Sequence, residues 1–253
     1  MKSKFLEIIY CCLGWFFKTI NFKKEKILIY SDSRGFDVIG TTGRNPFNSY
    51  LKGFIYNYNT EFFLRKEKHT SILDFLDEIS NLKMNTYDYV ILHCGVVDFS
   101  PRPLSNLNWV LNSKEGNKYF QLSKSTYKGH YEKPSNILYD NEETNNLYSK
   151  EFLVDIIIPK LKSIDNLIWI NSNNFVKNWD GNFSKGRPKN IADFVSSYDD
   201  VLKDNLDYVV DLKKWNDFEI KKYTIDNIHF TKDGFKEVYR MINEMIVKIN
   251  SSK

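Results

Sequence analysis

Apolar residues along the chain gather in short runs, and these alternate with longer stretches of helical periodicity. Five runs are rich in β-branched and aromatic residues and end at a turn or a polar residue, which is typical of buried strands. These runs are residues 26–31, 62–65, 87–94, 167–171 and 208–212. Five further stretches repeat apolar residues every three or four positions, as on one face of a helix. These stretches are residues 46–58, 71–82, 148–164, 190–206 and 231–249.

Strands that alternate with helices predict a parallel sheet with helices on both faces, and therefore an α/β fold class. We expect one domain over residues 26–253, with a polar, weakly periodic insert at about 99–145 that shapes a substrate cleft. Ligands of open parallel sheets bind at the carboxyl ends of the strands. The residues after the first and third strands, at 31–35 and 95–98, should therefore share a functional edge.

Residues 1–25 contain an apolar segment at 5–20 with lysines on both sides. A helix of that length spans about 24 Å, less than the roughly 30 Å hydrocarbon core of a bilayer. One interpretation is a peripheral helix in a membrane surface, with Trp15, Phe16 and Phe17 inserted and the lysines near anionic headgroups. The other interpretation is a helix packed on the protein's own core or on a second copy. The sequence leaves both open.

The composition excludes several classes of protein. The 253 residues are 42% hydrophobic and 27% charged, which is ordinary for a globular protein and unlike a disordered or multi-spanning chain. The 36 basic residues exceed the 32 acidic ones only slightly and form no stripe, so we expect no nucleic-acid partner. Cys11, Cys12 and Cys94 have no disulfide-framework spacing, which favours a cytoplasmic location. Neither metal-ligand spacing nor a phosphate-binding glycine motif occurs, so we expect no metal and no cofactor.

Two motifs place hydrolytic chemistry near the expected functional edge. Ser33 follows the first strand, and Asp226 and His229 stand just before the last helix. A carboxylate three residues before a histidine can accept a hydrogen bond from one ring nitrogen and leave the other to take a serine proton. A serine hydroxyl is a weak nucleophile without such a base. The sequence therefore predicts a catalytic triad of Ser33, His229 and Asp226.

These motifs resemble the sequence blocks of the SGNH (GDSL-type) hydrolase family over about residues 26–249. ILIYSDSRG resembles the Gly-Asp-Ser block, with Ser31 in place of the glycine, and IDNIHFTKDGF resembles the Asp-x-x-His block. Gly95 to Asp98 stand where the family has Gly-x-Asn-Asp. The resemblance implies a flavodoxin-like, three-layer α/β/α fold with a five-stranded parallel sheet. It also implies hydrolysis of esters, often of acyl groups on carbohydrates, by the three triad residues.

One departure from the family concerns the oxyanion donors. The asparagine of the third block is Val97 here, and losing one such donor costs about 10²–10³ in rate. The second-block glycine falls near Lys68, so the resemblance gives the backbone N–H groups of Ser33 and Lys68 as donors. Arg34 and Arg102 are candidates for a substitute donor and for substrate binding.

The sequence thus predicts a serine esterase that removes an acyl group from a carbohydrate or a surface-polysaccharide precursor. An O-acyltransferase that uses the same triad is one alternative, and a catalytically inactive glycan-binding protein of the same fold is another. Synthesis of surface polysaccharide would suit a cytoplasmic protein at the inner face of the membrane. Asp32 and Asp98 are expected to tie down their own loops, and His93 to be a buried histidine with satisfied hydrogen bonds.

Overall fold

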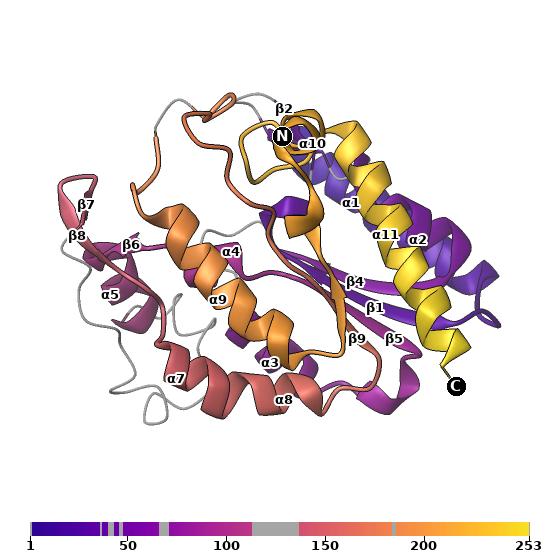
Figure 1. Ribbon diagram of the computed structural model, residues 1–253. Helices are drawn as coiled ribbons and strands as arrows, with labels where there is room; N and C mark the ends of the chain where they lie inside the picture. The colour runs from indigo at the N-terminus through magenta and orange to yellow at the C-terminus, as the bar shows by residue number, and fades with distance from the viewer. Residues whose placement is uncertain are drawn as a thin grey trace.

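The computed structural model describes residues 2–35, 37–39, 43–45, 48–65, 71–112, 137–183 and 186–252. Its centre is a five-stranded sheet in the order β10-β9-β5-β1-β4, with every neighbouring pair parallel (Figure 1). The strands are β1 (Lys26–Ser31), β4 (Asn59–Leu64), β5 (Tyr89–His93), β9 (Leu167–Ile170) and β10 (Tyr208–Val210). Counted along the chain, their spatial order is 2-1-3-4-5, which is the flavodoxin-like order. The predicted α/β class and the five-stranded parallel sheet are confirmed.

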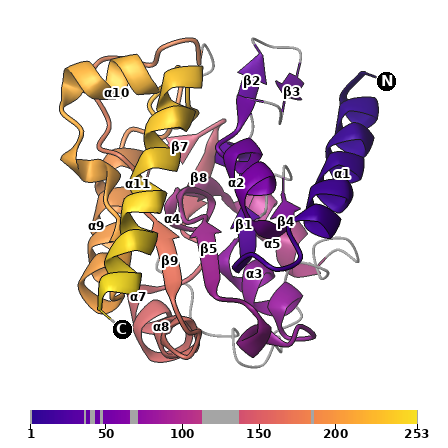
Figure 2. The same ribbon diagram turned by 90° about the vertical axis from the view of Figure 1, so that its right-hand side faces the viewer.

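Helices cover both faces of this sheet and give three layers (Figures 1 and 2). One face carries α3 (Ile72–Ile79), the segment from α7 (Lys150–Phe152) to α8 (Ile158–Lys162), and α9 (Ile191–Asn205). The other face carries α2 (Leu51–Asn57) and α11 (Lys232–Ser251). The periodicity predicted one helix over 148–164, but a π-helical turn, Leu153–Ile157, separates α7 from α8. Pro159 follows at the start of α8, and its missing N–H removes one helical hydrogen bond there.

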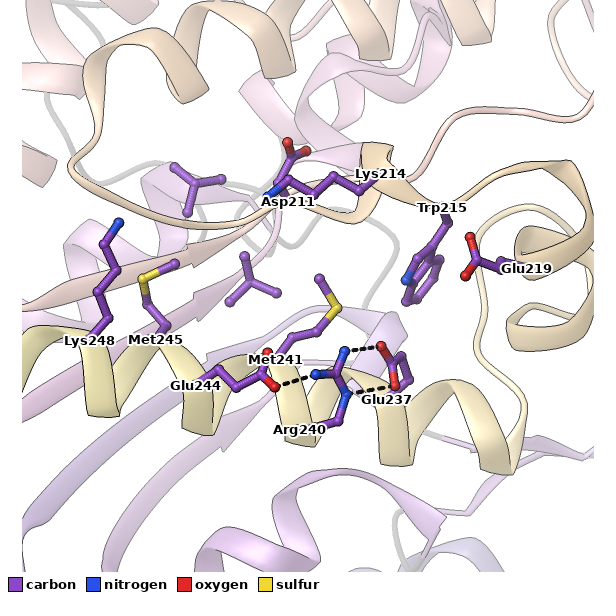
Figure 3. Close-up of a pocket in the computed structure, with 12 residues that line it drawn as sticks. Asp211, Lys214, Trp215, Glu219, Glu237, Arg240, Met241, Glu244, Met245 and Lys248 are labelled. Atoms are coloured by element: carbon purple, nitrogen blue, oxygen red, sulfur yellow. Dashed lines mark hydrogen bonds and ion pairs between the residues drawn. The ribbon is translucent and has the colours of Figure 1, made fainter.

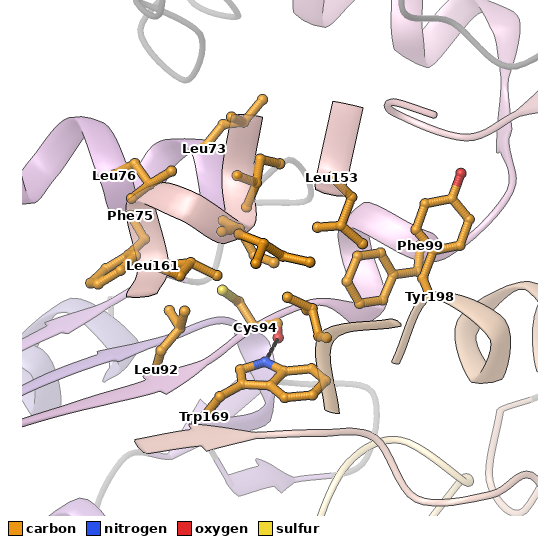
Figure 4. Packing of buried hydrophobic residues seen from close by; sticks show 14 of the residues in the cluster. Leu73, Phe75, Leu76, Leu92, Cys94, Phe99, Leu153, Leu161, Trp169 and Tyr198 are labelled. Carbon is orange, nitrogen blue, oxygen red and sulfur yellow. Dashed lines mark hydrogen bonds between the residues drawn. The ribbon is translucent and has the colours of Figure 1, made fainter. Parts of the chain in front are cut away.

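Side chains of the central strands alternate between two hydrophobic cores. In β1, Leu28 and Tyr30 enter the core under α3 and α9, and Ile27 and Ile29 enter the core under α2 and α11. All four side chains are fully buried, which explains why the sequence of this strand is a continuous apolar run. The first core includes Trp169 of β9, which lies on the sheet side of the cluster and whose indole N–H donates to the Cys94 carbonyl at 3.1 Å (Figure 4).

Helix α1 (Lys2–Ile20) lies beside β4, the edge strand of the sheet (Figure 2). Gly14 allows the close approach, because a Cβ there would lie 2.8 Å from the ring of Phe62. Phe17 packs edge-on against Tyr56, with ring centroids 4.6 Å apart. The helix therefore covers a strand edge that would otherwise be open to pairing. Within the part of the chain that the structure describes, no helix is long and apolar enough to cross a membrane.

Several elements were not predicted. Helix α10 (Asp217–Tyr223) precedes the Asp226–His229 loop, and the short hairpin of β2 (Asp37–Ile39) and β3 (Gly43–Asn45) follows the Ser33 turn. The described parts of the insert form α4 (Val96–Phe99), β6 (Arg102–Pro103), α5 (Leu104–Asn112), β7 (Leu138–Tyr139) and β8 (Glu142–Asn145). Three 3₁₀ turns complete the described elements: η1 (Ser33–Gly35), η3 (Met84–Thr86) and η6 (Leu212–Lys214). The division at residue 25 and the insert as a separate feature stay predictions.

Candidate active site

Ser33 opens the η1 turn directly after β1. Its neighbours Asp32 and Arg34 are buried, whereas Ser33 itself is partly exposed. Gly35 closes the turn, because a Cβ there would lie 2.4 Å from the Ser31 hydroxyl oxygen. The turn is therefore held tightly beneath the Ser33 side chain, which is partly exposed at the carboxyl end of the sheet.

The carboxylate of Asp32 holds this turn together, as the sequence predicts. Its Oδ1 accepts from the Arg34 amide at 2.9 Å and from Arg34 Nε at 3.1 Å. The Arg34 guanidinium also donates to the Asn171 carbonyl and the Ser172 hydroxyl, and only 2% of its side chain is exposed. Burial alone lowers the pKa of Arg34, but the charge of Asp32 outweighs it and leaves the pKa raised. The structure thus gives Arg34 a structural role in place of the expected contact with substrate.

Asp226 and His229 lie in the loop between α10 and α11. The Asp226 Oδ2 atom is 2.8 Å from His229 Nδ1, and its Oδ1 accepts from the His229 amide at 2.7 Å. The carboxylate thus holds both the ring and the backbone of the same histidine. Burial disfavours the charge on Asp226, but the hydrogen bonds and charge of His229 and the charge of Arg187 outweigh it, so its pKa is lowered.

Asn227 fixes the path of this loop. Its φ of 67° lies in the left-handed region, which asparagine tolerates better than most residues. The Asn227 side chain accepts from the Val176 amide at 2.8 Å and donates to the Trp179 carbonyl. The loop that carries the histidine is therefore tied to the segment after β9.

The two motifs meet at the carboxyl end of the sheet. Ser33 Oγ lies 3.2 Å from His229 Nε2, although 196 positions separate the two residues. With the Nδ1 proton donated to Asp226, Nε2 is left with a lone pair toward the serine hydroxyl. The contact lies outside the neighbouring strands β1 and β5, where the strand order reverses and open sheets bind their ligands.

A cleft of about 370 Å³ opens over Ser33 and His229. One wall comes from α4 and the following turn, and the opposite wall from the loop after β9 and the start of α9. The insert contributes Asn106, Tyr139 and Asp140 to the rim. Arg102, a sequence-predicted substrate contact, lines the cleft and donates from Nε to the Val97 carbonyl at 3.2 Å.

Arg187 lines the same cleft and was not predicted from the sequence. Its Nη2 lies 3.1 Å from Asp226 Oδ2, and its guanidinium stacks on the Phe183 ring at 4.3 Å from the centroid. Burial lowers the pKa of Arg187, with the charge of Asp226 acting against that fall. The signal available in the sequence was an arginine in a Gly-rich loop after the fourth strand, in a chain with only six arginines.

The other predicted residues have varied placements. Val97 lines the cleft where the family has its asparagine, and Lys68 lies outside the described residues. Asp98 is buried and accepts from the Ile72 amide and the Tyr148 hydroxyl, which fixes its loop as expected. His93 is fully buried, with Nδ1 3.0 Å from Tyr50 Oη. Its Nε2 has no partner among the described residues, so its hydrogen bonds are only half satisfied.

A larger groove of about 450 Å³ runs between β10 and α11 (Figure 3). Its lining includes the side chains of Trp215, Met241 and Met245 but no serine, cysteine or histidine. The one arginine in its lining, Arg240, is paired with Glu237 and Glu244. Of these two sites in the described part of the chain, the cleft over Ser33 is the one that joins a nucleophile to a base.

Comparison with known proteins agrees with this architecture. No protein-family model matches the sequence, and no curated protein matches it. The solved lipase/acylhydrolase from Enterococcus faecalis has a TM-score of 0.51 at 13% identity, covering 88% of this chain and 95% of that one. A member of the lipolytic protein G-D-S-L family from Veillonella parvula DSM 2008 aligns with a TM-score of 0.47 at 16% identity, over 87% and 97%. The chain has the fold of the SGNH (GDSL-type) hydrolases, as its motifs led us to expect.

Proposed function

We propose that this protein is a serine hydrolase of carboxylic esters, with Ser33 as nucleophile, His229 as base and Asp226 as the acid that orients the base. The observation that carries the proposal is the 3.2 Å contact between Ser33 Oγ and His229 Nε2, with Asp226 2.8 Å from Nδ1. This arrangement supplies nucleophile, base and orienting carboxylate in the order that acyl transfer requires.

In the proposed reaction, Ser33 Oγ attacks the ester carbonyl while His229 Nε2 takes the serine proton. The tetrahedral intermediate collapses as His229 returns that proton to the leaving alcohol, and the acyl group stays on Ser33. Water then gives a proton to His229 and attacks the acyl carbonyl. The bond to Ser33 Oγ breaks as His229 returns that proton to the serine oxygen, and the carboxylic acid is released. Asp226 stays ionised throughout and stabilises the imidazolium, which suits a carboxylate whose pKa is lowered.

The oxyanion needs donors other than the side chain at position 97, because valine has none. The backbone N–H of Ser33 is one candidate, and the backbone near Lys68 remains the second proposed donor. Arg102 is the candidate side chain, since it lines the cleft directly after the α4 wall.

We further propose that the substrate is an acylated carbohydrate. Asn106, Tyr139 and Asp140 give the cleft rim amide, hydroxyl and carboxylate groups, which hydrogen-bond sugar hydroxyls well. Phe183 adds an aromatic surface on the Arg187 side. A surface-polysaccharide precursor fits this rim as the physiological substrate class.

A fluorophosphonate probe tests the nucleophile. The wild type should be labelled, and Ser33→Ala should not; His229→Ala should label at least 10³-fold more slowly, in line with triad variants elsewhere. Ser100→Ala is the matched control, because the Ser100 hydroxyl donates to the Val96 carbonyl and no described histidine contacts it. Equal labelling of wild type and Ser33→Ala would refute the assignment. No labelling of a folded wild type would favour a glycan-binding protein without activity.

Transfer of the acyl group to a sugar hydroxyl would use the same triad. Acetate release from an acetylated carbohydrate, measured with and without an acceptor glycan, separates the two reactions. We expect release without the acceptor. Release that occurs only as acetylated acceptor would identify an O-acyltransferase instead.

A further inference from the structure

We propose that the ester substrate carries an anionic group, a carboxylate or a phosphate, that is bound by Arg102 and Arg187. This inference rests on the proposed function, because it places the anion beside the ester carbon that Ser33 attacks. Both guanidinium groups line the cleft that also holds Ser33 and His229. The chain has only six arginines, so two in one cleft is a strong concentration of the residue that best recognises carboxylate and phosphate.

Arg102 is a partly buried cation without a paired carboxylate among the described residues; the charges of Asp98 and Asp32 act on it from beyond ion-pair distance, and burial still lowers its pKa. Its Nε donates to a neutral acceptor, the Val97 carbonyl, and it forms no ion pair within the described ranges. Taking a guanidinium out of water without an opposite charge is costly. An anion bound in the cleft would offset that cost and would accept hydrogen bonds from the remaining N–H groups of the Arg102 guanidinium.

Arg187 offers a second, independent sign of a ligand. Only 8% of its side chain is exposed, and its Nη1 is buried without a hydrogen-bond partner in the part of the chain that the structure describes. Its Nη2 is held by Asp226, and Phe183 supports the guanidinium plane. Leaving a buried donor unpaired destabilises the fold, so such a group usually has a partner in the functional complex.

The placement of Arg187 also indicates which part of the substrate carries the charge. Arg187 shares Asp226 with His229, and His229 is the group that returns the proton to the leaving alcohol. The proposal therefore places the anion on the alcohol portion of the ester, in the cleft that both arginines line. For a carbohydrate ester, an acidic sugar such as a uronic acid or a sugar phosphate has this chemistry.

The test compares O-acetylated glucuronate with O-acetylated glucose, which differ in the C6 carboxylate. The wild type should prefer the glucuronate ester, and Arg102→Met or Arg187→Met should lower that preference about 10- to 100-fold, the scale of a charge-assisted hydrogen bond. Arg240→Met is the matched control, because Arg240 lies in the other groove and is paired there with two glutamates. The preference should also fall as ionic strength rises.

Equal kcat/KM for the two esters in the wild type would overturn the anion proposal and leave the proposed function standing. An equal loss on both esters in Arg102→Met would make Arg102 an oxyanion donor and overturn its assignment to the anion. Calorimetric titration of Ser33→Ala with acetylated glucuronate tests binding without turnover. Arginine-dependent binding there would support anion recognition even if the wild type hydrolysed neither ester.

A second observation, on α1, carries a separate inference. The side chains at positions 8, 12, 15, 16 and 20 fall on one helical stripe, and all are exposed. Ile8, Trp15, Phe16 and Ile20 are 61%, 73%, 52% and 57% exposed, and Phe22 just beyond the helix is 66% exposed. The opposite side is the one that packs on β4 and α2, through Gly14 and Phe17. An apolar stripe that points outward is the reverse of the usual pattern for a surface helix.

The charge around this stripe indicates what covers it. Residues 1–26 contain six lysines and two glutamates, so this segment accounts for the whole +4 net charge of the chain. Lys23 and Lys24 are exposed directly beside Phe22. Lys18 and Lys26 of this segment pair with Glu61. We infer that the stripe rests on an anionic bilayer surface, with Trp15 and Phe16 at the headgroup boundary and Lys23 and Lys24 on the lipid phosphates.

Vesicle flotation with the full chain tests this inference. The protein should float with phosphatidylglycerol-containing vesicles and much less with pure phosphatidylcholine. Replacing both Trp15 and Phe16 by serine should reduce flotation at least 10-fold, whereas Phe218→Ser, which changes a 76% exposed aromatic residue on α10, should not. A wild type that stays in the vesicle-free fraction would overturn the inference. A dimer that dissociates in the double variant would assign the stripe to a second copy.

Discussion

The guanidinium of Arg187 lies 3.1 Å from Asp226 Oδ2, the same oxygen that faces His229 Nδ1 at 2.8 Å. One carboxylate oxygen thus serves a buried arginine and the proposed base together. Asp226 has no freedom to rotate without losing one of these partners. The consequence is a base held rigidly, by a residue that the triad motif does not contain.

Replacing Arg187 should therefore affect turnover beyond any effect on substrate affinity. We expect Arg187→Met to lower kcat about 10- to 100-fold, since a small misplacement of a catalytic group costs on that scale. Arg187→Lys should recover part of the loss, because its ammonium can still approach Asp226. Steady-state kinetics on the neutral glucose ester would show the effect, with circular dichroism as the check on folding. A change confined to KM would make Arg187 a binding residue only.

The loop asparagine gives a second prediction. Asn227→Ala removes two side-chain hydrogen bonds and places alanine at a φ of 67°, so it should destabilise the protein by roughly 2 kcal/mol. Asn227→Gly relieves the backbone cost but not the lost hydrogen bonds, so it should fall between alanine and wild type. Urea unfolding measures the free energy of unfolding of the wild type and of both variants. If glycine and alanine were equally destabilising, the left-handed backbone would contribute nothing at this position.

Asp98 predicts a pH dependence of stability. Burial raises its pKa to about 7, against the hydrogen bonds from Tyr148 and the Ile72 amide that favour the charged form. Between its ordinary value near 4 and about 7, the folded chain keeps a proton that the unfolded chain loses. Stability should then fall as pH rises through this range, by about 1.4 kcal/mol per unit from this group.

Asp98→Asn should remove that contribution, because the amide is neutral at every pH. The measurement is the difference in free energy of unfolding between wild type and Asp98→Asn at pH 5, 6, 7 and 8. It isolates Asp98 from Asp199, whose pKa is also raised by burial to about 7. A difference that does not change with pH would show that Asp98 is ionised throughout.

Trp169 predicts a packing effect. It is fully buried and lies below Cys94 on the sheet side of the core in Figure 4, so Trp169→Ala should cost about 3–5 kcal/mol through lost burial and an unfilled cavity. Phe218→Ala is the matched exposed change and should stay within about 0.5 kcal/mol. Thermal unfolding compares the two. A small effect at Trp169 would mean that neighbouring side chains collapse into the space.

The sequence predicted the central strands well because each is buried on both faces and flanked by turns. The rule for parallel sheets placed Ser33 at the functional edge, whereas His229 was predicted from the Asp-x-x-His motif before the last helix and not from a strand end. The direction in which the Arg34 side chain points could not be predicted from the strand pattern. An arginine next to a nucleophile in the sequence indicates a contact with substrate. Only the ion pair with the buried Asp32 carboxylate shows that Arg34 has a structural role.

The missed features have different physical causes. Arg187 reaches Asp226 from a loop without periodicity, and tertiary packing alone decides that contact. Helix α10 is only seven residues long and depends on a capping box between Asn216 and Glu219 more than on an apolar face. The π turn before α8 depends on where Pro159 falls within an otherwise regular helical pattern.

The contact between Ser33 and His229 joins the first strand of the sheet to the loop before the last helix. A nascent chain that has not yet emerged beyond position 229 cannot complete it, and neither can a fragment that lacks either end. Reactivity at Ser33 should thus appear only after the chain has been made past His229 and this part of it has folded. The time at which Ser33 becomes labelled would then report when this protein has matured in the cell.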